Sequence, residues 1–237
     1  MRDKEFEYLE CERQYVFFLL MFVGGFLGAF TYSVRGGIFC NAQTVNFLLM
    51  GIAIGNQDYG KAWYYLIPMC ACLGGTVLSE ALPTPIKKLE IIRWDTLLIG
   101  IETMVILLLG FLPETAPFQI SQITVNIIMS MQYNTFRQAR GIPMATTFCT
   151  NHVRQVGVSL YKAICYRNRK HSMHFLIHTG MLIAFAGGAG VSSALCGWLS
   201  GKAIWFLLFP LGILLVQLLK ADLVKEKDFF HVTPGGH

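Results

Sequence analysis

The stretch RGGIFCNAQTVNFLLMG, residues 35–51, is a polar, glycine-containing interruption between two strongly apolar segments. An altered copy, ARGIPMATTFCTNHVRQVG, occupies residues 139–157, and aligning Thr44 with Thr150 also aligns Gly51 with Gly157. In each copy an Arg-Gly pair leads to small and amide-bearing residues, then to an apolar run that is too short to cross a bilayer. A polar break that occurs twice within hydrophobic sequence is typical of the place where a membrane protein handles something other than lipid.

The composition indicates a membrane protein. Of the 237 residues, 54% are hydrophobic and only 14% are charged, whereas a soluble domain carries roughly a quarter charged residues. The net charge of +5 comes from short basic clusters between apolar runs, so no nucleic-acid partner is expected. The seven cysteines lack paired ligand spacing, which argues against a disulfide framework or a zinc site.

Six apolar runs are long enough to cross a bilayer at about 1.5 Å per residue. Two further runs, 43–55 and 146–161, are apolar for only about three turns, which favours re-entrant or broken helices. We expect one transmembrane domain over residues 15–220, with half-repeats at about 15–112 and 118–220. It is flanked by a cytoplasmic segment 1–14, which lacks a cleavable signal, and a cytoplasmic tail 221–237. The predicted spans are residues 15–34, 62–82, 96–112, 118–136, 173–196 and 203–219.

The distribution of Lys and Arg supports this topology. With both termini cytoplasmic and both short segments re-entrant, only Arg35, Lys61 and Lys202 face outward, and Arg154 lies in the second short segment. All other Lys and Arg residues then face the cytoplasm, as the positive-inside rule requires. If both short segments crossed fully, this bias would weaken.

The two halves resemble each other in order: span, short segment, span, span. LGGTVLSEAL (residues 73–82) matches AGGAGVSSAL (residues 186–195) at five positions, including Gly75 with Gly188 and Ser79 with Ser192. Because the first three spans start inside and the last three start outside, the pattern predicts an all-α membrane bundle with a 3+3 inverted-topology repeat, an architecture of secondary transporters. The alternative is that glycine and alanine recur in any packed membrane helix.

The segments GGFLGAFTYSVRGGIFCNAQTVNFLLMG and SMQYNTFRQARGIPMATTFCTNHVRQVG resemble the two signature regions of the YoaK-like bacterial membrane proteins, a family of unknown function. The resemblance covers about residues 22–219 and implies a multi-pass protein of the bacterial inner (plasma) membrane with no established activity. Family members usually carry Thr-Gly-Asn in both short segments. Here these positions read Thr44-Val45-Asn46 and Thr150-Asn151-His152, and Gly28 stands where an acidic residue is usual.

The polar residues of the two short segments and the fourth span are the candidate pathway for a substrate or ion. Thr44 and Thr150 fall near helix starts, where free N–H groups and the positive end of the dipole attract anions. The structural alternative is that these side chains cap helix N-termini or form interhelical hydrogen bonds, each contributing about 1 kcal/mol to stability. The candidate residues are Asn41, Gln43, Thr44, Asn46, Glu102, Gln132, Asn134, Arg137, Thr150, Asn151, His152 and Arg154.

Glu102 lies within the apolar run TLLIGIETMVILLLGFL, where a carboxylate costs a few kcal/mol unless it is paired or protonated. Either it carries a proton during transport, or it forms a structural ion pair with Arg137, Arg154 or His152.

His171, His174 and His178 share a helical face at the start of the fifth span. Such histidines can bind metal or relay protons, but they more often lie at headgroup level, and no metal is expected.

No nucleotide-binding loop, nucleophile elbow, metalloprotease helix or catalytic carboxylate pair is present in the sequence, so we expect neither an enzyme nor a cofactor. The first hypothesis is a small permease or channel, whose partners would be the lipid bilayer and a small polar or anionic solute. Six spans leave a thin wall around a pathway, which is compatible with a homodimer. The second hypothesis is a non-transporting membrane scaffold or accessory subunit, which the loss of both motif glycines favours.

Overall fold

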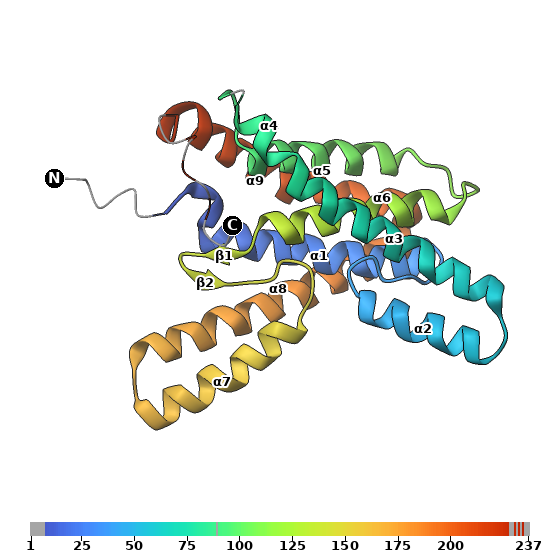
Figure 1. Ribbon diagram of the computed structural model, residues 1–237, viewed down its shortest axis with the longest axis horizontal. Coiled ribbons are helices and arrows are strands. Elements are labelled where there is room, and N and C mark those ends of the chain that lie inside the picture. The colour runs from blue at the N-terminus through green and yellow to red at the C-terminus, as the bar shows by residue number, and fades with distance from the viewer. Residues whose placement is uncertain (1–7, 89, 228–229, 231, 233, 235–237) are drawn as a thin grey trace.

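The computed structural model describes residues 8–88, 90–227, 230, 232 and 234, and its secondary structure is almost entirely helical (Figure 1). A short hairpin of β1 (Gln138–Ala139) and β2 (Ile142–Pro143) lies between α6 and α7, with Ala139 opposite Ile142. The helices are η2 (Glu10–Glu12), α1 (Gln14–Val34), α2 (Gln43–Gly55), α3 (Tyr59–Ala81), α4 (Pro83–Lys87), α5 (Trp94–Gly110), α6 (Phe118–Thr135), α7 (Thr150–Tyr166), α8 (Arg169–Leu199), η3 (Ser200–Leu207), α9 (Leu208–Lys220) and η4 (Ala221–Lys225).

Each predicted apolar run is helical, and most helix ends lie within a few residues of the predicted ones. The second short segment differs most. Residues 146–149 are not helical, and α7 continues to Tyr166 rather than ending at Tyr161. The run 203–219 is divided between η3 and α9.

The two short helices join the following long helices through turns of the same construction. Gln57 (φ 60°) and Arg167 (φ 45°) both adopt the left-handed conformation that ends a helix. Asp58 then accepts a hydrogen bond from the Lys61 N–H at 3.1 Å and caps α3, and Asn168 caps α8 in the same way. These side-chain caps satisfy N–H groups that a helix start leaves free.

The packing is organised around α1, whose side chains are largely buried. Helix α1 runs along α8, and α6 runs along α3. The short helix α2 packs on α3, and α7 packs on α8. Figure 1 shows that α2 and α7 both begin near the middle of the bundle and run toward opposite ends.

The apolar core lies between α1, α5, η3 and α9. Phe26 of α1 stacks on Phe206 of η3, with ring centroids 5.9 Å apart. At one end of α5 the Trp205 Nε1–H donates to the Leu107 carbonyl. At its other end the Arg93 N–H donates to Asp222 of η4. The chain from η3 through α9 therefore runs antiparallel to α5, after a reversal at Ser200 (φ 47°).

Three helical stretches of the described chain are long and apolar enough to cross a membrane: Gln14–Val34, Tyr59–Lys87 and Arg169–Lys225. The last of these contains both the predicted fifth span and the predicted sixth. The apolar helices establish the character of a membrane protein. The predicted segments 1–14 and 221–237, including Arg2 and Lys4, lie partly outside the described residues.

Candidate functional site

The loop between α1 and α2, residues 35–42, is held against α3 and α6. The Tyr64 hydroxyl of α3 donates to the Gly36 carbonyl at 2.9 Å. The Gln122 amide of α6 donates to the Arg35 carbonyl at 2.7 Å. Side chains of α3 and α6 thus satisfy two carbonyls of this irregular segment. Arg35, Ile38 and Cys40 are buried, whereas Gly36 and Gly37 are exposed, so the loop is fixed against the bundle and partly covered by it.

The loop between α6 and α7, residues 136–149, is held by its own hairpin and by α6. The Met144 N–H donates to the Arg137 carbonyl at 2.9 Å, which extends the β1–β2 hairpin. The following residues Ala145, Thr146 and Thr147 are buried. The Gln132 amide of α6 lies 3.5 Å from the Thr146 carbonyl oxygen, a long hydrogen bond.

Both loops meet the middle of α1 at two glycines. The Asn41 amide of the first loop donates to the Gly24 carbonyl at 2.9 Å. A Cβ atom at Gly24 would lie 2.7 Å from the Thr146 oxygen of the second loop. A Cβ atom at Gly28 would lie 2.8 Å from the Asn41 side chain. Small residues on α1 therefore admit both polar loops, and Asn41 fills the space that an acidic residue at position 28 would need.

Amide and hydroxyl groups form a buried polar layer where the loops meet α1 and α6. Gln43 donates to Asn126 of α6 at 2.7 Å, and Asn46 donates to Gln43 at 3.1 Å. Three atoms of this layer are buried and have no hydrogen-bond partner within the described part of the chain: Asn46 Oδ1, Gln132 Oε1 and Thr146 Oγ1. An unsatisfied buried group costs about 1–3 kcal/mol, so each requires a functional or structural reason. The polar layer consists of Asn41, Gln43, Asn46, Asn126, Gln132 and Thr146.

A pocket of about 300 Å³ lies beside this layer, between α6, the hairpin and the start of α7. Arg137 forms an ion pair with Glu80 of α3. The Asn134 amide donates to Ser79 at 2.7 Å and to Glu80 at 2.9 Å. This side pocket therefore combines the Arg137 guanidinium, which is paired with Glu80 outside the lining, with the amides of Asn134 and Asn151. It is lined by Tyr133, Asn134, Arg137, Pro143, Met144, Ala145, Phe148 and Asn151.

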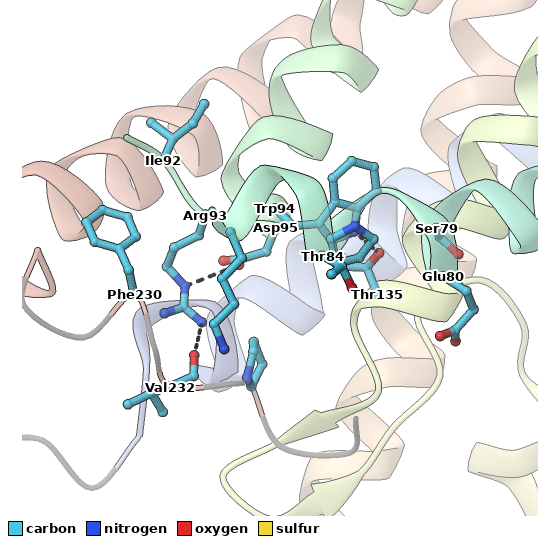
Figure 2. Close-up of a pocket in the computed structure, with 13 residues that line it drawn as sticks. Ser79, Glu80, Thr84, Ile92, Arg93, Trp94, Asp95, Thr135, Phe230 and Val232 are labelled. Carbon is cyan, nitrogen blue, oxygen red and sulfur yellow. Dashed lines mark hydrogen bonds and ion pairs between the residues drawn. The ribbon is translucent and has the colours of Figure 1, made fainter. Parts of the chain in front are cut away.

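A second pocket, of about 200 Å³, lies at the end of the bundle where α5 begins (Figure 2). The Arg93 guanidinium lies 3.3 Å from Asp95 and donates to the Val232 carbonyl at 3.2 Å. Burial alone would lower the pKa of Arg93, but Asp95, Glu226 and Asp222 together raise it. This charged pocket ties the start of α5 to the end of the chain.

The structure brings most of the predicted site residues together. Asn41, Gln43, Asn46 and Gln132 belong to the polar layer, while Asn134, Arg137 and Asn151 line the side pocket. Thr44, Thr150 and Arg154 are exposed.

Thr44 and Thr150 lie in the first turns of α2 and α7, as predicted, but the structural alternative that they are N-caps is wrong. Helix α2 begins one residue before Thr44 and α7 begins at Thr150, and neither helix start has a side-chain cap. An exposed threonine inside the first turn cannot accept the hydrogen bonds that a capping residue one position earlier accepts. Arg154 instead donates to Asn151 at 3.0 Å on the surface of α7.

Of the two alternatives for Glu102, the structural ion pair with Arg137, Arg154 or His152 is wrong, and the proton-carrying role stays a prediction. Glu102 is buried on α5, and neither carboxylate oxygen has a hydrogen-bond partner among the described residues. Arg137 pairs with Glu80, and His152 bonds to His178. The reason is topological, because α5 packs mainly on α9 and η3, away from the elements that carry the three proposed partners.

Two features were not predicted from the sequence. His152 and His178 form a buried pair between α7 and α8, although both residues were considered separately. Within the described chain, no group of three or more metal-ligating side chains occurs. Around Arg93, Asp95 is two residues away, but Asp222 and Glu226 come from the distant end of the chain, so local spacing could not have indicated the whole cluster.

Comparison with known proteins places the chain in a family. Residues 16–217 match the family described as "Protein of unknown function (DUF1275)". Because the match covers most of the chain, the protein belongs to this family. None of the curated proteins and none of the solved structures matches it.

Proposed function

We propose that the protein is a small permease or channel of six spans, built from two inverted halves, in which α2 and α7 are re-entrant helices. The solute would be a small polar or anionic species that contacts the polar layer. The observation that carries the proposal is the meeting of the two loops at Gly24, next to buried polar atoms without partners. A buried polar group without a partner costs about 1–3 kcal/mol, so we take these atoms as groups kept for contact with a solute.

The packing supports two equivalent halves. Exchanging the halves replaces α1 by α6, α2 by α7 and α3 by α8. Under this exchange the α1–α8 contact becomes the α6–α3 contact, and the α2–α3 contact becomes the α7–α8 contact. All four contacts are present. A chance similarity of sequence would not require packing that is preserved in this way.

The aligned glycines support the same equivalence. A Cβ atom at Gly75 of α3 would lie 2.5 Å from the Ile127 oxygen of α6. A Cβ atom at Gly188 of α8 would overlap the Phe22 oxygen of α1. Each glycine therefore allows close backbone approach at the corresponding helix pair.

A third correspondence lies at the starts of the short helices. Asn46 donates to the Phe39 carbonyl at 3.1 Å, and the His152 Nε2–H donates to the Ala145 carbonyl at 2.8 Å. In both cases a buried side chain bonds to the main chain seven residues earlier. This contact fixes each loop against its own short helix.

The length of α2 and the direction of both short helices support the re-entrant arrangement. Helix α7 has 17 residues, as many as α5, so its assignment rests on its direction and on its equivalence to α2. Helix α2 has 13 residues, which at 1.5 Å per residue gives roughly 20 Å, less than the bilayer core of about 30 Å. Both helices start near the middle of the bundle and run to opposite ends (Figure 1). We therefore assign α1, α3, α5, α6, α8 and η3–α9 as the spans, with both termini in the cytoplasm of a bacterial cell.

A flux assay in proteoliposomes tests the proposal. Probes are potassium formate, potassium nitrate, urea and glycerol, followed by light scattering after an osmotic step. We expect flux of at least one probe, reduced at least about tenfold by Thr146→Val, which removes a hydroxyl of the polar layer. Thr76→Val is the matched control, because the Thr76 hydroxyl bonds only within α3. Equal flux in empty and protein-containing vesicles for every probe would contradict the proposal.

The second candidate function is a non-transporting scaffold or accessory subunit. The observation that favours it is the exposed apolar face of α2, which includes Phe47, Leu48 and Ile52. Co-purification with a fixed partner, together with the absence of flux for all four probes, would support this function. A homodimer would bury the same face, and its test is the mass of the purified protein in detergent.

A further inference from the structure

The buried histidine pair joins the short helix α7 to the long helix α8. His152 Nδ1 lies 2.9 Å from His178 Nδ1, and His152 Nε2 lies 2.8 Å from the Ala145 carbonyl oxygen. The side chains are 0% and 2% exposed, respectively. Both ring nitrogens of His152 are therefore engaged, one by a main-chain carbonyl and one by another imidazole.

The geometry fixes the position of each proton in the neutral pair. A carbonyl oxygen only accepts hydrogen bonds, so His152 carries its proton on Nε2. Its Nδ1 is then a lone-pair acceptor, and His178 must carry its proton on Nδ1 to donate to it. His178 Nε2 is left with a lone pair and has no partner among the described residues.

We propose that the His152–His178 pair is a proton-binding site that holds one proton at a time. A proton added at His178 Nε2 creates an imidazolium that still donates through Nδ1 to His152, so both hydrogen bonds survive. Transfer of the Nδ1 proton to His152 moves the positive charge from α8 to α7 and leaves His178 neutral, with its proton on Nε2. A second proton would place N–H against N–H at 2.9 Å and break the contact.

Access to the pair follows one face of α8. His174 lies one turn before His178, and His171 lies near the turn between α7 and α8. Both are partly exposed, unlike His178. They provide successive imidazoles between the end of the bundle and the buried pair.

Among the described residues, the elements packed around the pair place no carboxylate next to it to neutralise a second charge. On α8 the neighbouring titratable or charged groups are His174, His171 and Lys170; on α7 the nearest is Arg154, and in the preceding loop Cys149. Helix α1, which packs on another face of α8, carries no titratable side chain between Tyr15 and Tyr32. Lys202 of η3 follows the other end of α8.

In the first half of the chain, the position equivalent to His152 holds Asn46, whose amide does not titrate. Asn46 makes the equivalent main-chain bond, while Tyr65 aligns with His178. His152→Asn should therefore keep the bond to the Ala145 carbonyl and remove proton sharing. The site itself does not depend on transport, although a proton bound there would be the coupling ion of a permease.

Nitrogen-15 NMR of histidine-labelled protein in detergent micelles tests the proposal. At neutral pH we expect His152 protonated on Nε2 and His178 on Nδ1, and on acidification one joint transition that shifts both residues together. In His152→Asn, His178 should titrate alone; in the control His174→Gln, the joint transition should persist. Finding His178 protonated on Nε2 at neutral pH, or two independent transitions, would overturn the proposal. The wild-type spectrum alone tests the predicted proton positions and the joint transition, even if His152→Asn does not fold. None of these measurements depends on whether the protein transports a solute.

Discussion

Four glycine-to-alanine variants test the close helix contacts and the equivalence of the halves together. Gly75 and Gly188 lie against the backbones of α6 and α1, whereas Gly74 and Gly187 have no heavy atom within 4 Å of an added Cβ. All four lie inside helices, where alanine is favoured over glycine by about 1 kcal/mol. The neighbouring pairs therefore share the helix-propensity effect and differ in steric surroundings.

The expected magnitudes follow from these surroundings. At Gly74 and Gly187 the substitution should raise the free energy of unfolding by up to about 1 kcal/mol. At Gly75 and Gly188 the new methyl group meets backbone atoms that cannot swing away. The overpacking cost of about 1–3 kcal/mol or more should then exceed the propensity gain. Because the helix-propensity gain is the same in each neighbouring pair, it cancels in the comparison. We expect Gly75→Ala and Gly188→Ala to be less stable than their neighbours' variants by about 1–3 kcal/mol.

The assay is reversible unfolding by sodium dodecyl sulfate in mixed micelles, followed by the fluorescence of the four tryptophans. The two buried positions should lose stability by similar amounts, because they occupy equivalent helix contacts. If Gly188→Ala were as stable as Gly187→Ala, the close approach of α8 to α1 would be wrong. If only one of the two buried positions responded, the halves would not be equivalent.

Three further predictions concern buried charged and thiol groups. Glu102→Gln should be at least as stable as the wild type at about pH 8, because an unpaired buried carboxylate is removed; a loss above about 1 kcal/mol would reveal a partner for Glu102. Burial raises the pKa of Glu226 above its ordinary value of 4.5, so the folded state favours the neutral carboxyl and loses stability as pH rises from 4.5 through the raised pKa. Glu226→Gln should therefore gain stability over the wild type at about pH 8 and lose this advantage below pH 4.5; an equal difference at both pH values in thermal unfolding would contradict it. Burial also raises the pKa of Cys11, whereas Cys165 is exposed, so maleimide at neutral pH should modify Cys165 and spare Cys11, as peptide mass spectrometry can check.

The helices were predictable because a continuous apolar run has one stable form in a lipid environment. The bounds of α2 follow directly from residues 43–55, and the Gly75–Gly188 match predicted positions that prove to be close helix contacts. The start of α7 was harder, because Thr146 and Thr147 are polar enough to cap a helix yet are buried against α1 instead.

The site was predictable only as a set of polar residues. Sequence spacing indicates that His178 and His152 each lie on a helix, but it cannot show that these helices form an antiparallel hairpin with the two rings in contact. It likewise cannot show that Glu102 faces away from every arginine considered as its partner. Such relations depend on tertiary packing between distant segments, which local periodicity does not record.

The measurement that tests the central claim most directly is the sidedness of Asp58 and Asn168, the residues that cap α3 and α8. The exposed Cys70 and Cys165 are first replaced by serine, and a single cysteine is then introduced at position 58 or 168. Intact cells are labelled with a membrane-impermeant maleimide. An amino-terminal epitope gives the reference side. With both short helices re-entrant, Asn168 lies on the side of the epitope and Asp58 on the opposite side. Asp58 on the side of the epitope would mean that α2 crosses the membrane. Asp58 and Asn168 both opposite the epitope would mean that α7 crosses and α2 does not. Either result would contradict the inverted arrangement of the halves.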